Sequence, residues 1–142
     1  MKPTLTLPSF PKAVEDWWWL QANQKWPEIG EEKRLNLIRQ EIVEQSDRFN
    51  KDRSFDPSSY GKRDLSIISY GNFYFSRTWI ASLFAMGETL TRCQWTPPKN
   101  GPIRILDVGS GTGASGLACL SLLRSQGVTN PLELHAWNYS SK

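Results

Sequence analysis

The chain has 142 residues, of which 39% are hydrophobic and 12% aromatic, so its composition is that of a packed globular protein and not of a disordered one. The formal net charge of +3 comes without a run of like charges, so it gives no argument for a nucleic-acid partner. The two cysteines, Cys93 and Cys119, form no C-x-x-C pair, so we expect no zinc or iron–sulfur site.

The N-terminal segment of about ten residues contains Pro3 and Pro8 and has no long apolar run. It therefore predicts an extended arm, and neither a signal peptide nor a membrane anchor. Because two lone thiols also suit a reducing compartment, we expect a cytoplasmic protein that has no membrane partner.

A first helix is predicted to begin near Ser9, which would cap it, and to end near Trp26, where Pro27 stops it. Three consecutive tryptophans at 17–19 lie inside this helix, where successive positions point about 100° apart. They cannot all face one core. We expect an aromatic core here in preference to a binding platform, with at least one tryptophan meeting another element, a partner or solvent.

A second helix is predicted to begin at Glu31 and Glu32, because the helix dipole favours acidic side chains in a first turn. Apolar residues follow at helical spacing, with charged residues between them, which indicates one buried face. They are Leu35, Ile38, Ile42 and Phe49. Residues 50–63 contain Pro57, Gly61 and several polar side chains, so they predict a loop or linker.

A third helical stretch is predicted over residues 65–92, with Gly71 dividing it and Asn72 capping its second piece. One apolar face consists of Phe73, Ile80, Phe84 and Leu90.

The proline-rich segment 95–102 ends the helical pattern. It predicts a boundary between a helical N-terminal region, 1–95, and a second region, 96–142.

The second region has the pattern of a strand, a glycine loop, a helix and another strand. Residues 103–108 predict a short buried strand, and an apolar helix follows the loop 109–113. This helix runs to about Gln126, where Gly127 fits its end, and residues 132–137 predict the second strand. The fold class we expect is therefore α/β, with a helical N-terminal region followed by the first βαβ unit of a Rossmann-like sheet.

The loop between the first strand and its helix is the candidate site. It consists of Asp107-Val108-Gly109-Ser110-Gly111-Thr112-Gly113. Glycines let the backbone approach a ligand, and the helix that follows offers unpaired N–H groups. Ligands bind at the carboxyl ends of parallel strands, so we expect a cofactor at this loop.

Two classes of cofactor fit the glycine pattern. Residues 111–116 match G-x-G-x-x-G, the fingerprint of NAD(P)-binding oxidoreductases, which is weak evidence by itself. Asp107 stands two positions before the first of three alternating glycines, and this arrangement resembles the first motif of class I S-adenosylmethionine (SAM) dependent methyltransferases. A carboxylate repels a pyrophosphate but attracts the ammonium group of SAM. The methyltransferase is therefore the favoured interpretation, and the oxidoreductase is the alternative.

The resemblance implies a role for each residue of the motif. Asp107 would face the methionyl amino group, directly or through water. Three glycines would form the floor under the ribose and the methionine tail, with backbone or hydroxyl contacts from the two residues between them. These five are Gly109, Ser110, Gly111, Thr112 and Gly113. The ordinary alternatives are a cap for Asp107 and a tight turn for the glycines.

The end of the second strand departs from the family's pattern. The family has an acid there that binds both ribose hydroxyls, and Asn138 stands at that position. An amide lacks the charge-assisted strength of a carboxylate, so a non-catalytic ribosome-assembly protein with this fold is a further alternative. Tyr139 is placed to lie against the adenine. His135, in the strand, is expected to be a core histidine and not a catalytic one.

A second, looser resemblance lies upstream. The aromatic-rich segment 70–78, which contains Arg77, is similar to a helix that precedes the glycine motif in methyltransferases of the mitochondrial small-ribosomal-subunit-associated type. This resemblance implies a methyl acceptor in RNA or the ribosome. Tyr74 and Arg77 would either close over the cofactor carboxylate or form a structural helix face.

The number of predicted strands is small for a class I methyltransferase sheet. We therefore expect the chain to be the front part of a longer, truncated protein, and to be inactive by itself. No catalytic base is predicted, because in this fold it follows a later strand.

Overall fold

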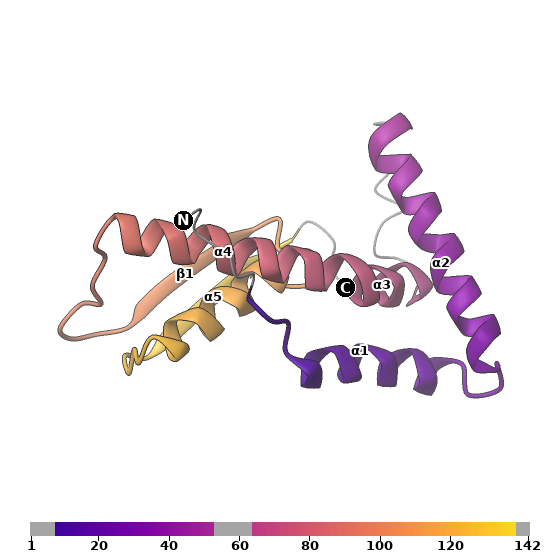
Figure 1. Ribbon diagram of the computed structural model, residues 1–142, viewed down its shortest axis with the longest axis horizontal. Helices are drawn as coiled ribbons and strands as arrows, with labels where there is room; N and C mark the ends of the chain where they lie inside the picture. The colour runs from indigo at the N-terminus through magenta and orange to yellow at the C-terminus, as the bar shows by residue number, and fades with distance from the viewer. Residues whose placement is uncertain (1–7, 53–63, 139–142) are drawn as a thin grey trace, which may run out of the picture. The chain divides into compact units, whose positions relative to one another are not determined.

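The computed structural model describes residues 8–52 and 64–138. Its elements follow one another in the order shown in Figure 1. They are α1 (Lys12–Lys25), α2 (Glu31–Asp47), η1 (Arg48–Asp52), α3 (Asp64–Tyr70), η2 (Gly71–Phe75), α4 (Ser76–Arg92), β1 (Ile103–Val108), α5 (Ala114–Ser125) and β2 (Leu132–Trp137). The two η elements are π-helical.

The chain forms two compact units, and the division falls between Ser76 and Arg77. The helical unit contains residues 11–76, and the second unit contains residues 77–138 with residues 8–10. The proline-rich segment 95–102 had predicted the boundary further along the chain. Helix α4 groups instead with the glycine loop and the strands.

Helix α1 begins directly after Pro11, whose carbonyl accepts the N–H groups of Val14 and Glu15 at 3.0 and 3.2 Å. The expected cap at Ser9 is wrong, because Pro11 is the residue at the cap position and no side chain caps the helix. The helix ends at Lys25, close to the predicted end, and the Trp26 N–H donates to the carbonyl of Ala22.

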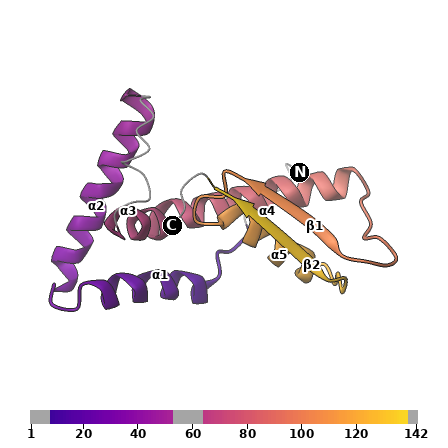
Figure 2. The same ribbon diagram turned by 180° about the vertical axis from the view of Figure 1, so that it is seen from behind.

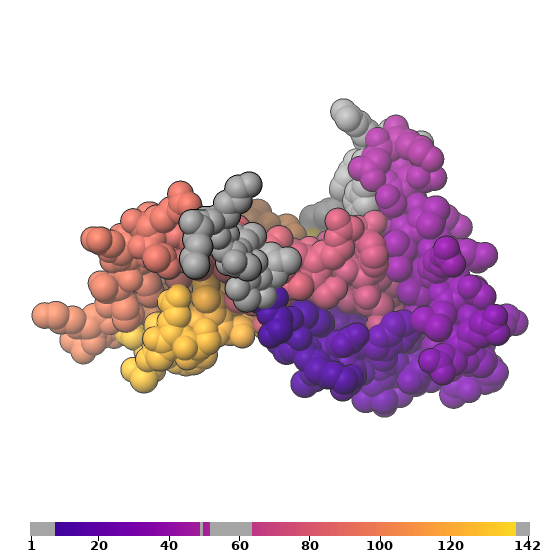
Figure 3. All heavy atoms as spheres, viewed as in Figure 1, coloured from indigo at the N-terminus to yellow at the C-terminus, as the bar shows by residue number. Residues whose placement is uncertain are grey.

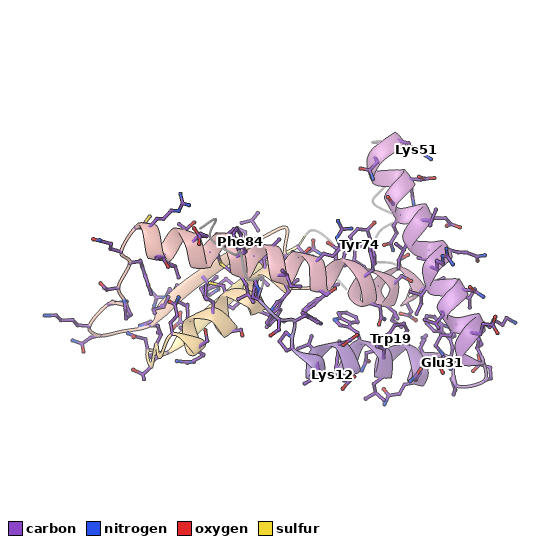
Figure 4. All side chains as sticks on the ribbon, viewed as in Figure 1. Lys12, Trp19, Glu31, Lys51, Tyr74 and Phe84 are labelled. Carbon is purple, nitrogen blue, oxygen red and sulfur yellow. The ribbon has the colours of Figure 1, made fainter. Side chains whose placement is uncertain are left out.

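The core of the helical unit is small and apolar. One cluster in it consists of Ala22, Ile38 and Ile68, with Trp19, Trp26, Ile42 and Leu65 packed around it, and Trp18 and Phe75 are also buried in this unit. Figure 4 labels Trp19 on α1, and Figure 3 shows the atoms of α1 against those of α2. Leu35, expected on the same buried face as Ile38, is exposed. Phe49 lies in η1, and its side chain is outside the described part.

The three consecutive tryptophans have different surroundings, as the helical spacing predicts. Trp17 is half exposed, Trp18 is buried, and Trp19 packs against the apolar core. The buried indole lies directly against Gly71, where a Cβ atom would overlap it, and its ring centroid is 5.6 Å from that of Phe75.

A buried polar cluster ties α2 to α3. The Ser66 hydroxyl donates to Glu41 Oε1 at 2.6 Å, and Gln45 Nε2 donates to the Ser66 carbonyl at 3.0 Å. Arg48 Nη2 lies 3.3 Å from the same Glu41 oxygen. The carboxylate of Glu41 is therefore buried together with a cation and hydrogen-bond donors, which a buried charge requires.

Residues 64–92 are helical throughout, so the predicted division at Gly71 takes the form of a π-helical turn and not of a break. Asn72 does not cap a helix. Its Nδ2 donates to the carbonyls of Ile68 and Trp18, at 2.8 and 3.4 Å. The predicted loop 50–63 is helical at its first three residues, which belong to η1, and residues 53–63 lie outside the described part.

Strands β1 and β2 pair in parallel, from Ile103 opposite Leu132 to Val108 opposite Trp137. They lie side by side and end at the same edge (Figure 2). Both strands have the predicted bounds. Helix α5 also ends as predicted, because Gly127 adopts a φ of 79° and its N–H donates to the carbonyl of Arg124.

The prediction that β1 is a buried strand is wrong for one of its two faces. Ile103, Ile105 and Asp107 are half-buried, and the residues that alternate with them are exposed. Leu106 and Val108 are 57% and 72% exposed. The alternation arises because α5 packs on β1 and β2, while the outward-facing side chains stay accessible to solvent.

Helix α4 contacts α5 through the Ser82 hydroxyl, which donates to the Ser115 hydroxyl at 3.1 Å. Phe10 meets Trp79 of α4 edge to face, with ring centroids 5.8 Å apart. Both contacts lie within the second unit. In the part of the chain that is described, we find no helix with the length and apolar character that a membrane span requires.

Candidate cofactor-binding site

The glycine loop has a backbone that favours glycine at three alternate positions. The φ angles of Gly109, Gly111 and Gly113 are 71°, 54° and 82°. Positive φ values of this kind are accessible to glycine without strain and are disfavoured for residues that have a Cβ atom. Each of these glycines therefore occupies a backbone conformation that suits glycine better than any residue with a Cβ atom.

The loop is anchored to the end of β2. The N–H groups of Gly109 and Ser110 donate to the carbonyl of Trp137, at 2.7 and 3.0 Å. Within the loop, the Gly113 N–H donates to the Ser110 carbonyl at 2.7 Å. Three of the loop's amides therefore have partners inside the protein and do not need a ligand.

Asp107 connects β1 to α5. Its Oδ2 accepts the N–H of Gly116 at 2.9 Å, in the first turn of the helix. The first N–H groups of a helix have no partner within the helix, so a carboxylate there is a cap, and its charge is favoured by the helix dipole. The structure thus shows the cap that is the ordinary interpretation of Asp107. A ligand contact through the same carboxylate remains a prediction.

Gly116 allows α5 to lie close to both strands. An ideal Cβ atom on this residue would lie 2.7 and 2.9 Å from the two methyl carbons of Leu134, and 3.0 Å from Oδ2 of Asp107. One sequence feature points to this residue, namely its place as the last glycine of G-x-G-x-x-G. Its contact with Asp107 was not expected.

The hydroxyl groups near the loop differ in their partners. Ser110 and Thr112 are half-buried. Thr112 Oγ1 is buried and has no hydrogen-bond partner among the described residues. Ser115, in the first turn of α5, is bonded to Ser82. The Thr112 hydroxyl is therefore a polar group in the loop that a ligand could satisfy.

The second strand brings a further predicted residue to the same edge. Because Val108 pairs with Trp137, the chain leaves β1 and β2 side by side, at Gly109 and Asn138. Asn138 is half-buried, and Tyr139 lies outside the described residues. The predicted core position of His135 is wrong. His135 is exposed, because its side of β2 faces away from α5.

Cys119 is the one thiol near the loop in the described part of the chain. It lies on α5, one turn after Gly116, and is half-buried. Burial, followed by the negative charge of Asp107, raises the pKa of the Cys119 thiol above its ordinary value. The thiol therefore stays protonated at neutral pH, which argues against a nucleophilic role.

Comparisons of the chain with protein-family models, with curated proteins and with solved structures found no match. Among residues 8–52 and 64–138, no group of three or more His, Cys, Asp or Glu side chains is placed to hold a metal ion. The site is therefore defined by its own geometry: a carboxylate at the end of β1, a glycine loop and the end of β2.

Proposed function

We propose that Asp107 and the loop 109–113 form the SAM-binding half-site of a class I methyltransferase. The observation that carries the proposal is the position of Asp107. Its carboxylate lies at the carboxyl end of a parallel strand and bonds the first turn of the following helix. Three glycines with positive φ angles begin two residues later.

The electrostatics of the loop favour SAM over a dinucleotide. A helix N-terminus normally attracts phosphate, through its free N–H groups and its dipole. Here the carboxylate of Asp107 already accepts the Gly116 N–H, and the N–H groups of Gly109 and Ser110 donate to the carbonyl of Trp137. A pyrophosphate would meet fewer donors and a like charge. The ammonium group of SAM would meet an attractive charge.

The end of β2 supports the same cofactor more weakly. Asn138 follows β2 at the edge where the glycine loop begins, and an amide can hydrogen-bond a ribose hydroxyl. The bound cofactor would supply an electrophilic methyl group to a nucleophile of the acceptor. The described residues of the site contribute position and electrostatics to such a reaction. We propose RNA or a ribosomal component as the acceptor on the resemblance of segment 70–78.

A second candidate is an NAD(P)-binding oxidoreductase. Gly116 favours it, because the last glycine of the dinucleotide fingerprint allows close packing between helix and strand, and Gly116 packs against Leu134 in this way. A third is a non-catalytic ribosome-assembly protein, which Asn138 favours because it replaces the expected acid. The charge of Asp107 makes the dinucleotide the weaker candidate.

Calorimetric titration with SAM and with S-adenosylhomocysteine tests the proposal. The wild-type protein should bind both. Gly111→Val should abolish binding, because a β-branched side chain is strained at a φ of 54°, while the helical circular-dichroism signal is retained. Gly87→Ala is the control, since a Cβ atom there has no neighbour within 4 Å. Binding that survives in Gly111→Val would show that the loop does not contact the ligand.

A further inference from the structure

We infer that Gly116 is a positioning residue of this site, and that it acts by holding the carboxylate of Asp107. The N–H of Gly116 is the donor to Oδ2 of Asp107, at 2.9 Å. The position of a Cβ atom on Gly116 is only 3.0 Å from the same oxygen. A side chain at 116 would therefore push the carboxylate away from the amide that binds it.

The hydrogen bond between Gly116 and Asp107 joins the residues on either side of the glycine loop. Asp107 precedes the loop 109–113, and Gly116 follows it in the first turn of α5. A second attachment comes from β2, because the Trp137 carbonyl accepts two N–H groups of the loop. The loop is thus held at the ends of β1 and β2 and at the start of α5.

This arrangement fixes the loop before any ligand arrives. A loop that is already ordered loses less conformational entropy when it binds, so its affinity is higher. For the SAM site proposed above, on which the ligand part of the inference rests, Asp107 then acts in two ways. One carboxylate oxygen positions the loop, and its charge attracts the ammonium group of the cofactor.

The positioning function can be tested without a ligand, by amide hydrogen exchange measured with NMR. In Asp107→Ala, exchange at the Gly116 N–H should become about tenfold faster or more, the scale of a lost hydrogen bond to a charged group. The N–H groups of Gly109 and Ser110 should also lose protection. Asp107→Asn keeps an acceptor oxygen, so exchange at 116 should stay within about threefold of the wild type. Unchanged exchange at 116 in Asp107→Ala would overturn the inference.

The alternative is that Gly116 serves only to make room for Leu134, and a double variant separates the two roles. Gly116→Ala alone should destabilise the protein and weaken S-adenosylhomocysteine binding about tenfold, the scale of a lost charged hydrogen bond. Adding Leu134→Ala removes the methyl carbons at 2.7 and 2.9 Å but leaves the contact with Asp107. Loop protection and ligand affinity should therefore stay low in the double variant. Full recovery of both would show a packing role alone.

The two claims fail separately. If the wild-type protein does not bind S-adenosylhomocysteine, the proposed function fails, and the exchange rates still decide whether Asp107 and Gly116 hold the loop. If it binds, and Gly116→Ala binds equally well, the inference fails and the proposed function stands. Gly87→Ala is the matched control for a glycine inside a helix. Should Gly116→Ala not fold, the exchange rates of the two Asp107 variants decide the question.

Discussion

Asn138 is the residue at which the chain departs from the methyltransferase pattern, and restoring an acid there is expected to raise the affinity for the cofactor. Asn138→Asp should tighten S-adenosylhomocysteine binding by about 1 kcal/mol, because a charged acceptor forms a stronger hydrogen bond with a ribose hydroxyl than an amide does. Calorimetry measures this change. Asn100→Asp, in the exposed segment between α4 and β1, controls for the added charge. Weaker binding in Asn138→Asp would mean that the asparagine suits a different ligand.

The two cysteines should react at different rates, because their surroundings differ. Cys93 is exposed, whereas the pKa of Cys119 is raised by burial and by Asp107. At pH 8, iodoacetamide should therefore alkylate Cys93 first, as mass spectrometry of the peptides can show. Asp107→Asn should narrow the difference without removing it, since burial is the larger cause. Equal rates in the wild type would contradict the described position of Cys119.

The raised pKa of Cys119 also has a consequence for stability. A thiol whose pKa is higher in the folded state than in the unfolded state favours folding while both states are protonated. This contribution is present below the ordinary pKa of 9.0 and is lost as the pH rises through the folded-state value. The loss of stability is therefore confined to alkaline solution.

The sequence predicted which segments are helical more closely than it predicted the residues that cap them. Helix α2 begins at Glu31 as expected, because acidic side chains mark its first turn. Ser9 suggested a cap that Pro11 replaces, since a proline can open a helix with its own carbonyl. The π-helical turn at Gly71 could not be predicted, because its surroundings include Trp18, which lies far away in the sequence.

From the contact between Trp18 and Gly71 we predict how a substitution at Gly71 changes the stability of the helical unit. Gly71→Ala should destabilise it by about 1–3 kcal/mol, the usual range for overpacking, because a Cβ atom would overlap the indole. Urea unfolding measured by tryptophan fluorescence tests this. Gly87→Ala should be neutral or stabilising, since its Cβ atom meets nothing within 4 Å and alanine is the better helix former. An unchanged urea midpoint in Gly71→Ala would contradict the described packing.

The strands and the glycine loop were predicted with the right bounds, since short apolar runs between breakers identify strands well. The same pattern could not show which face of β1 is covered. The Asp107 cap was foreseen as an alternative, but its donor, Gly116, was not. That contact depends on the distance between α5 and the strands, and this distance cannot be predicted from the sequence.

The face of the sheet that points away from α5 exposes large apolar side chains to solvent. Leu106, Val108 and Trp137 are 57%, 72% and 63% exposed there. Contiguous apolar surface of this kind binds hydrophobic dyes. Val108→Thr should therefore lower the fluorescence of the dye ANS and leave the thermal midpoint within a few degrees. An unchanged dye signal would show that this face is not accessible in solution.

The division of the chain into two units was predicted at the proline-rich segment 95–102, and the structure places it at Ser76. The proline segment is an exposed connection. Helix α4 is hydrogen-bonded to α5 through Ser82 and Ser115, and no local sequence signal marks this pair. Breaker residues locate the ends of helices, but packing decides which helices belong together.

We propose that the carboxylate of Asp107 selects SAM at a loop that would otherwise suit a dinucleotide. Calorimetric titration of one preparation with S-adenosylhomocysteine and with NAD tests this selection in a single experiment. The proposal predicts binding of S-adenosylhomocysteine and no measurable heat with NAD, and in Asp107→Ala the affinity for S-adenosylhomocysteine should fall by about 1–3 kcal/mol. Binding of NAD by the wild-type protein, without binding of S-adenosylhomocysteine, would contradict the claim.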